Sequence, residues 1–212
     1  TISQGTSTKT WVGTGSTNVT GPNANFNNPL NWSPAGVPSE CNDVIMNMDV
    51  SEIFNFSSGN TVIPLTQNTT IKSLSIDVGG ALFLSAGSNF RLDAGTSSLT
   101  ILNNTLINSD ATAFLATPAR GYISVGNGGV VTYGGNLTST VANGCTNFPF
   151  YATTNNTGKF YLNGNAALGG VGNDLGNKPN QVIFNGTGTQ TISHNSGTQA
   201  ILFGATSTDI GE

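Results

Sequence analysis

The residues that could carry out catalysis are few and lie far apart in the sequence. The single histidine, His194, lies in the polar segment Ile192-Ser193-His194-Asn195-Ser196-Gly197, which is typical of a turn. No nucleophile-elbow motif accompanies it, so a Ser–His–Asp triad is not indicated. Asp77 and Asp93 occupy equivalent positions in a short repeat, and paired carboxylates can hydrolyse glycosidic bonds. We interpret these two as polar residues that keep one strand face hydrated.

Metal and lyase chemistry are the other catalytic alternatives. Asp43, Asn47 and Asp49 form the best local group of oxygen ligands, but calcium needs about six or more oxygens, and we expect neither a metal nor a cofactor. A polysaccharide lyase needs a base, and cations that neutralise a uronate. The basic residues in the interior of the sequence are Lys72, Arg91, Arg120, Lys159 and Lys178. None lies in a recognisable motif, so we predict that the chain is not an enzyme.

For ligand binding the most informative residues are aromatic, because such side chains offer a large flat surface and often a polar tip. Phe148, Phe150 and Tyr151 follow Cys145 in a loop-like segment, and Tyr161 comes shortly after them. These four aromatic residues are the best candidates for a sugar-binding platform. The alternative is that they pack as a loop over the body of the domain.

Composition excludes several classes of function. Only 8% of the 212 residues are charged and the net charge is −4, with six lysines plus arginines. Nucleic-acid binding needs clustered cations to neutralise phosphates, so no nucleic-acid partner is expected. No apolar run approaches the roughly 20 residues of a membrane-spanning helix, so no membrane insertion is expected. Because 36% of the residues are hydrophobic and occur in short bursts, the chain is predicted to fold rather than to be disordered.

A short tandem repeat indicates the type of fold. Leu74–Gly79 is followed by Leu82–Gly87 and Phe90–Gly95, and Leu99–Leu102 begins the pattern again. Each full unit is apolar-x-apolar-x-x-Gly, which predicts a short strand with one buried face and a glycine at a tight corner. We therefore expect one common core for the apolar positions Leu74, Ile76, Leu82, Leu84, Phe90 and Leu92.

The segment Phe160–Gly164 has a longer-range echo, because the similar segment Val182–Gly186 follows 22 residues later. Short strands at close spacing, together with this echo, suit a coil with two or three strands per turn. We predict an all-β fold, a parallel β-helix-like solenoid. The alternative is an antiparallel β-sandwich, which also has short, regularly spaced strands, but a sandwich gives no reason for a glycine corner to recur at a fixed position.

The N-terminal part of the sequence differs from the rest. Prolines punctuate a stretch rich in Asn and Gly that holds both tryptophans, Trp11 and Trp32. An open β edge invites pairing with other chains, so we interpret residues 1–40 as an N-terminal cap with the two tryptophans in its core. Residues 41–212 form the predicted β-solenoid domain. Because Ile201–Gly204 is still typical of a strand and its corner, we expect the solenoid to continue beyond the chain end.

The two cysteines, Cys41 and Cys145, lie 104 residues apart, a spacing unlike that of metal-binding pairs. Two alternatives stay open, a single disulfide in an exported protein or two unrelated thiols. The disulfide would stabilise the fold by about 4–5 kcal/mol through the loop that it closes in the unfolded chain.

Four segments of the N-terminal region occur in a fixed order. They are Trp11-Val12-Gly13, Asn31-Trp32-Ser33-Pro34-Ala35-Gly36-Val37-Pro38, Asp43-Val44-Ile45 and Thr69-Thr70-Ile71-Lys72-Ser73-Leu74-Ser75-Ile76. In order and spacing they resemble the N-terminal region of large cell-surface proteins of Bacteroidetes, and Phe184–Ile192 is similar to another recurrent element of those proteins. The resemblance implies export by the type IX secretion system and display on the outer cell surface.

The same resemblance implies a class of function. Members include very large adhesins, among them gliding-motility adhesins of the SprB type. We therefore expect a secreted cell-surface adhesin or filament segment that acts by binding or display, in surface adhesion or gliding motility. The expected partners are surface polysaccharide or other cell-surface components, and the secretion machinery during export. The alternative is a carbohydrate-active β-helix protein, either a polysaccharide lyase or a carbohydrate-binding module.

Overall fold

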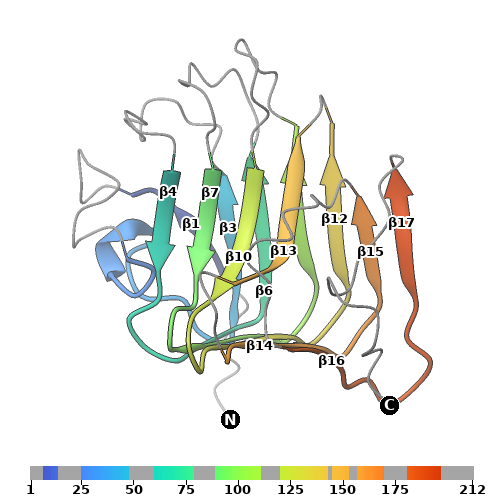
Figure 1. Cartoon of the computed structure of the whole chain (residues 1–212). Helices are drawn as coiled ribbons and strands as arrows, with labels where there is room; N and C mark the ends of the chain where they lie inside the picture. Colours follow the sequence, from blue (N-terminus) through green and yellow to red (C-terminus); the bar gives the residue numbers. More distant parts are fainter. Residues whose placement is uncertain are drawn as a thin grey trace.

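The chain coils into a three-sided β-solenoid in which successive turns stack side by side (Figure 1). The computed structural model describes residues 7–13, 25–47, 60–78, 89–110, 120–142, 145–152, 157–169 and 181–196. Strands make up 59% of the structure and helix 2%, the latter being the 3-10 turn η1 (Pro29–Asn31). No helix among these residues is long and apolar enough to cross a membrane.

Each side of the solenoid is one sheet. Sheet A contains, in spatial order, β17 (Ile192–Ser196), β15 (Ala166–Gly169), β12 (Leu137–Val141), β9 (Thr105–Ser109), β6 (Ser73–Val78), β3 (Asn42–Asn47), β1 (Ser7–Trp11) and β2 (Trp32–Ser33). Sheet B contains β13 (Thr146–Ala152), β10 (Arg120–Val125), β7 (Asn89–Asp93) and β4 (Asn60–Pro64). Sheet C contains β16 (Gln181–Phe184), β14 (Lys159–Leu162), β11 (Val130–Tyr133), β8 (Ser98–Ile101) and β5 (Thr69–Ile71).

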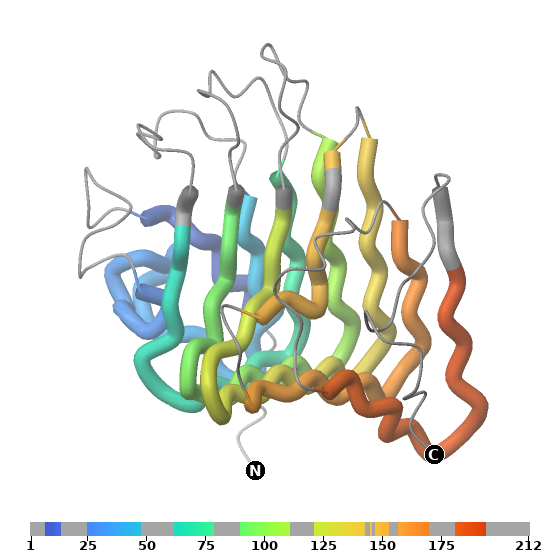
Figure 2. Tube along the Cα trace, in the orientation of Figure 1, coloured from blue at the N-terminus to red at the C-terminus, as the bar shows by residue number. Residues whose placement is uncertain are grey.

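The chain visits sheets A, B and C in the same order in each complete turn. The first turn is β3, β4 and β5, and the following turns are β6–β8, β9–β11 and β12–β14. Figure 2 shows this winding as a colour sequence from blue at one end to red at the other. Neighbouring strands pair in parallel, apart from the short antiparallel pair of β1 and β2. The prediction of a parallel solenoid is therefore confirmed, and the antiparallel sandwich is wrong.

The tandem repeat supplies the three sides of a single turn. The unit at Leu74 forms β6, the unit at Phe90 forms β7, and the unit at Leu99 forms β8. The unit at Leu82–Gly87 lies outside the described residues. The longer echo has a different origin, because Phe160 pairs with Val182 across sheet C. It marks the same strand position in two successive turns.

The core lies inside the coil and is built by alternate residues. Along β6 the side chains alternate between half-buried and buried, because successive residues of a strand point to opposite faces. Leu74 and Phe90 are each 2% exposed, and Ile76 and Leu92 are fully buried. These four predicted core positions are confirmed, whereas Leu82 and Leu84 lie outside the described residues.

An asparagine ladder holds the corner between sheets C and A. The side-chain oxygen of Asn104 accepts a hydrogen bond from the backbone N–H of Asn136 at 3.1 Å, one turn later. Asn136 in turn accepts from Asn165 at 3.0 Å, and Asn165 from Thr191 at 2.8 Å. Corner N–H groups otherwise need another partner or water, so each asparagine ties its own turn to the next.

The N-terminal residues extend sheet A and cover the first turn. β1 pairs in parallel with β3 (Figure 1), and β2 pairs in the antiparallel direction with β1. Trp11 and Trp32 are both buried, as expected, with their rings edge to face at 5.0 Å. Phe26 packs against Trp32 at 4.8 Å, and the Trp32 indole N–H donates to the Phe26 carbonyl at 2.7 Å. The boundary at residue 40 and the continuation beyond residue 212 stay predictions.

Cys41 and Cys145 are separate thiols. Cys41 precedes β3 in the first turn, whereas Cys145 precedes β13 three turns further along. Strands of one sheet lie about 4.8 Å apart, so the two cysteines are far beyond the roughly 7 Å limit between the Cα atoms of a disulfide. Of the two alternatives, the disulfide is wrong and the unrelated thiols hold.

The buried tyrosine Tyr133 should make the stability of the fold sensitive to alkaline pH. It is fully buried, its hydroxyl donates to the Pro149 carbonyl at 2.5 Å, and burial raises the pKa of this phenol well above 10. The folded state therefore keeps its proton while the unfolded chain loses it above about pH 10, so this contribution to stability is present below pH 10 and is lost as pH rises further. We expect Tyr133→Phe to be less stable by about 1 kcal/mol at pH 7.

Chemical unfolding of Tyr133→Phe and of the native chain at pH 7 and near pH 11 measures this effect. The gap in unfolding free energy should narrow or reverse at the higher pH, because phenylalanine has no proton to lose. If the difference in unfolding free energy between the variant and the native chain were the same at both pH values, Tyr133 would not be the cause of a loss of stability at alkaline pH.

Candidate functional site

The structure divides the four predicted aromatic residues among different surfaces. Phe148 and Tyr151 lie on the outer face of sheet B, on β13. Phe150 points the other way, where it packs against the core with its ring edge-on to Tyr133 at 5.8 Å and to Phe160 at 5.5 Å. Tyr161 lies on β14 between two core residues, so it faces outward from sheet C. The four residues therefore do not form one platform.

A β-bulge in β13 explains why Phe148 and Phe150 face opposite ways. Tyr122 and Ser124 of β10 are two residues apart, yet they pair with Phe148 and Tyr151, which are three apart. The extra residue on β13 reverses the alternation of side chains. Pro149, which has no N–H to donate to the ladder, lies within the irregular stretch, as is usual for proline in a sheet.

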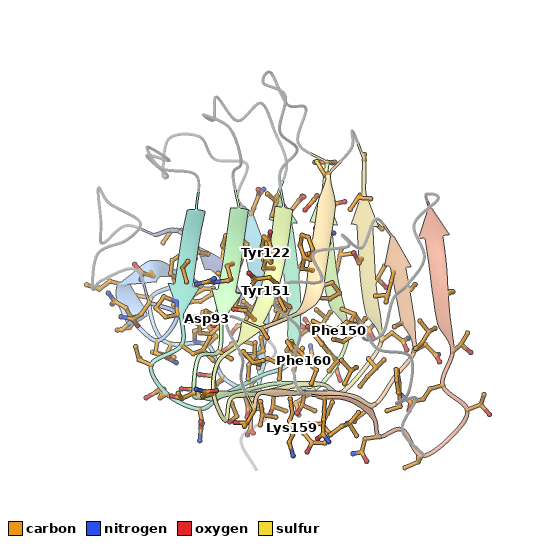
Figure 3. The ribbon with its side chains drawn as sticks, in the orientation of Figure 1. Asp93, Tyr122, Phe150, Tyr151, Lys159 and Phe160 are labelled. Carbon is orange, nitrogen blue, oxygen red and sulfur yellow. The ribbon has the colours of Figure 1, made fainter. Side chains whose placement is uncertain are left out.

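Tyr122 completes an aromatic cluster on the outer face of sheet B (Figure 3). Its ring stacks on that of Phe148 with centroids 4.5 Å apart and planes at 7°. The Tyr151 ring meets Tyr122 edge-on at 4.8 Å and Phe148 at 6.2 Å. Tyr122 and Phe148 are each only 6% exposed, although neither belongs to the core inside the coil. The stacked pair is thus a fixed support for the half-buried ring of Tyr151.

Polar side chains lie beside this aromatic cluster in the same sheet. Arg91 pairs with Tyr122 across the strands, and Asp93 pairs with Ser124. The Ser124 hydroxyl donates to Asp93 Oδ1 at 2.7 Å, and the Gly95 N–H donates to the same oxygen at 3.1 Å. Arg91 Nη2 lies 4.0 Å from Asp93 Oδ2. We call this set the sheet-B face, consisting of Arg91, Asp93, Tyr122, Ser124, Phe148 and Tyr151.

The two carboxylates in equivalent repeat positions do not share a face. Asp77 lies on β6 in sheet A, where Asn108 donates to it at 2.8 Å, whereas Asp93 lies on β7 in sheet B. Successive units of the repeat occupy different sides of the coil, which is why the expected shared face is wrong. Thr140 donates to Asn108 at 2.7 Å, so the sheet-A residues form a polar ladder of their own.

The other candidate residues lie away from the sheet-B face or outside the described part of the chain. Asp43 accepts from Ser73 at 2.6 Å and Lys72 at 2.9 Å, and these two groups lower the pKa of its carboxyl. Lys159 lies on sheet C. The side chains of Arg120 and His194, and all of Asp49 and Lys178, lie outside the description. In the described ranges, no three acidic, cysteine or histidine residues come together as a metal site.

Comparison with protein-family models, with curated proteins and with solved structures found no match to this chain. The candidate binding site therefore rests on the geometry of the sheet-B face. Sequence reasoning missed Tyr122 and Ser124, which are contributed by the next turn. Such partners could have been found from the length of a turn, because a partner in the next turn of the coil lies 22 to 32 residues away. Val182 lies 22 residues from Phe160, and Ser124 lies 31 residues from Asp93.

Proposed function

We propose that this chain is a non-catalytic binding or display module, and that it contacts carbohydrate through the sheet-B face. The observation that carries the proposal is the aromatic cluster of Tyr122, Phe148 and Tyr151, which lies on the outer side of sheet B and outside the core. Tyr122 and Phe148 are almost fully buried, so the half-buried ring of Tyr151, supported by that stacked pair, is the flat apolar surface offered to the C–H groups of a sugar. Arg91 and Asp93 beside them supply a donor and an acceptor for sugar hydroxyls.

The wider setting of this activity is the outer surface of a bacterial cell. The resemblance of the N-terminal segments to surface proteins of Bacteroidetes supports secretion and display, in adhesion or gliding. A solenoid suits this role, because stacked turns present an extended, regular surface to a partner. The partner in this proposal is a surface polysaccharide. A polysaccharide lyase is the competing function, since Arg91 and Tyr122 are neighbours on the same face.

Beads that carry the full chain should bind to a subset of an array of neutral and acidic polysaccharides. Tyr151→Ala should weaken that binding at least tenfold, about 1.4 kcal/mol, because it removes the half-buried ring of the cluster. The matched control is Tyr161→Ala, which removes a half-buried tyrosine from the outer face of sheet C and should leave binding unchanged.

Two results would contradict the proposal. Equal effects of the two tyrosine substitutions would remove the sheet-B face from the binding site. Release of new reducing ends or of unsaturated uronate products during incubation would replace binding with catalysis, provided that the activity disappears on substitution of a single basic residue.

A further inference from the structure

Arg91 is the least satisfied polar group of the sheet-B face. Within the described part of the chain its buried Nε has no hydrogen-bond partner, and the contact of its Nη2 is the ion pair with Asp93 at 4.0 Å. A guanidinium can donate five hydrogen bonds, and a buried donor without a partner destabilises the fold. The side chain is 29% exposed, so part of it is accessible from solvent.

Asp93 offsets part of this charge but takes up none of the guanidinium hydrogen bonds, because Arg91 Nη2 lies 4.0 Å from Asp93 Oδ2, beyond hydrogen-bond distance. Its Oδ1 accepts from both Ser124 and Gly95, and these two bonds hold the group in place. Its Oδ2 lies at the far limit of an ion pair with Arg91. Asp93 therefore fixes the edge of the site, while the guanidinium keeps its capacity to bind an anion.

The spacing of the groups sets the size of the ligand. Tyr151 pairs with Ser124, and Ser124 pairs with Asp93, so the Tyr151 ring lies two strands away from Arg91 and Asp93. At about 4.8 Å per strand, roughly 10 Å separates the backbone at the aromatic end of the face, Tyr151, from the backbone at the charged end, Arg91 and Asp93. A single sugar ring cannot reach both ends, whereas a chain of sugars lying across the strands can.

We propose that the sheet-B face binds an acidic oligosaccharide, with one sugar on Tyr151 and the carboxylate of a uronic acid unit on Arg91. This proposal rests on the proposed carbohydrate-binding function and names its ligand class. A planar guanidinium matches a carboxylate through two parallel hydrogen bonds, which is the interaction that the protein itself leaves unused. The negative charge of Asp93 repels a second anionic group on its side of Arg91. The face therefore binds one carboxylate of the ligand and not a densely charged ligand.

The test compares an oligogalacturonide with its fully methyl-esterified form, in which each carboxylate is replaced by a neutral methyl ester. Titration calorimetry with the full chain should show at least tenfold tighter binding of the acid. Arg91→Gln should abolish that preference, so that the acid and the ester bind with equal affinity. Arg91→Lys should restore only part of it, because lysine keeps the charge but not the paired donors. The matched control, Lys159→Gln, removes a cation from sheet C and should change neither affinity.

The outcomes separate this proposal from the one on which it rests. Equal affinities for acid and ester, both lost in Tyr151→Ala and unaffected by Arg91→Gln, would overturn the acidic ligand and keep the carbohydrate-binding function. Absence of binding to either oligosaccharide and to all members of the polysaccharide array would overturn both. Circular dichroism and thermal unfolding of each variant establish that a lost affinity does not come from a lost fold.

Discussion

Replacing Ile76 with aspartate is expected to lower the free energy of unfolding by about 4 kcal/mol or more, since the change places a carboxylate in the apolar core. Ile76 is fully buried in β6, between its register partners Met46 and Ile107 of the adjoining turns, which are also fully buried. None of these neighbours can donate a hydrogen bond from its side chain. Natural domains have only about 5–15 kcal/mol of stability, so this single change should remove much of it.

Urea unfolding followed by circular dichroism measures the loss, and Ser75→Asp is the matched control. Ser75 is the preceding residue of the same strand, half-buried on the outer face, so the same charge stays hydrated there and should cost less than about 1 kcal/mol. Burial raises the pKa of a carboxyl, so the difference between Ile76→Asp and the native chain should shrink as pH falls toward 4. Equal losses at residues 75 and 76 would contradict the inward assignment of Ile76.

The strands and corners of this fold were predictable because their signals are local. An apolar-x-apolar unit defines which face of a strand is buried, and the unit at Phe90–Gly95 ends on Gly95, whose φ of 56° is a left-handed conformation that glycine adopts at no steric cost. These features need no knowledge of what each strand pairs with. The inward positions of Phe90 and Leu92 follow from the pattern alone.

The length of a turn was not predictable, because the connections between the sheets vary. Twelve residues separate Asn47 of β3 from Asn60 of β4, whereas four separate Val141 of β12 from Thr146 of β13. A repeat search at fixed spacing therefore finds the strands within one turn and misses the register between turns. The corner asparagines Asn104, Asn136 and Asn165, one per turn, are the signal that would have supplied it.

The candidate site was predictable only in part for the same reason. Phe148 and Tyr151 were recognisable as an aromatic group, but strict alternation would place Phe148 and Phe150 on one face, and the bulge in β13 reverses that order. Arg91 and Tyr122 become neighbours only through the pairing of β7 with β10. A surface built across turns of a solenoid depends on register, which a single sequence specifies weakly.

The close stacking of turns at the corners gives the second large prediction, which is that Gly164→Ala destabilises the fold by about 3 kcal/mol. Gly164 lies at the corner between β14 and β15, directly against the corner of the preceding turn. A Cβ atom there would lie 2.5 Å from the Gly135 carbonyl carbon and 2.8 Å from the Asn136 nitrogen. Both are backbone atoms, so no side-chain rotation can relieve the overlap.

Gly188→Ala is the control, because Gly188 lies in the next connection between sheets C and A and a Cβ there would meet nothing within 4 Å. That substitution should raise the free energy of unfolding by less than about 1 kcal/mol, since alanine restricts the conformations of the unfolded chain. Hydrogen exchange provides a local readout. In Gly164→Ala the Asn165 amide, which donates to Asn136 Oδ1 at 3.0 Å, should exchange faster than in the native chain, because the added methyl group pushes the two turns apart. Native-like protection of that amide, or equal stability of the two alanine variants, would mean that the turns are not in the close contact described here.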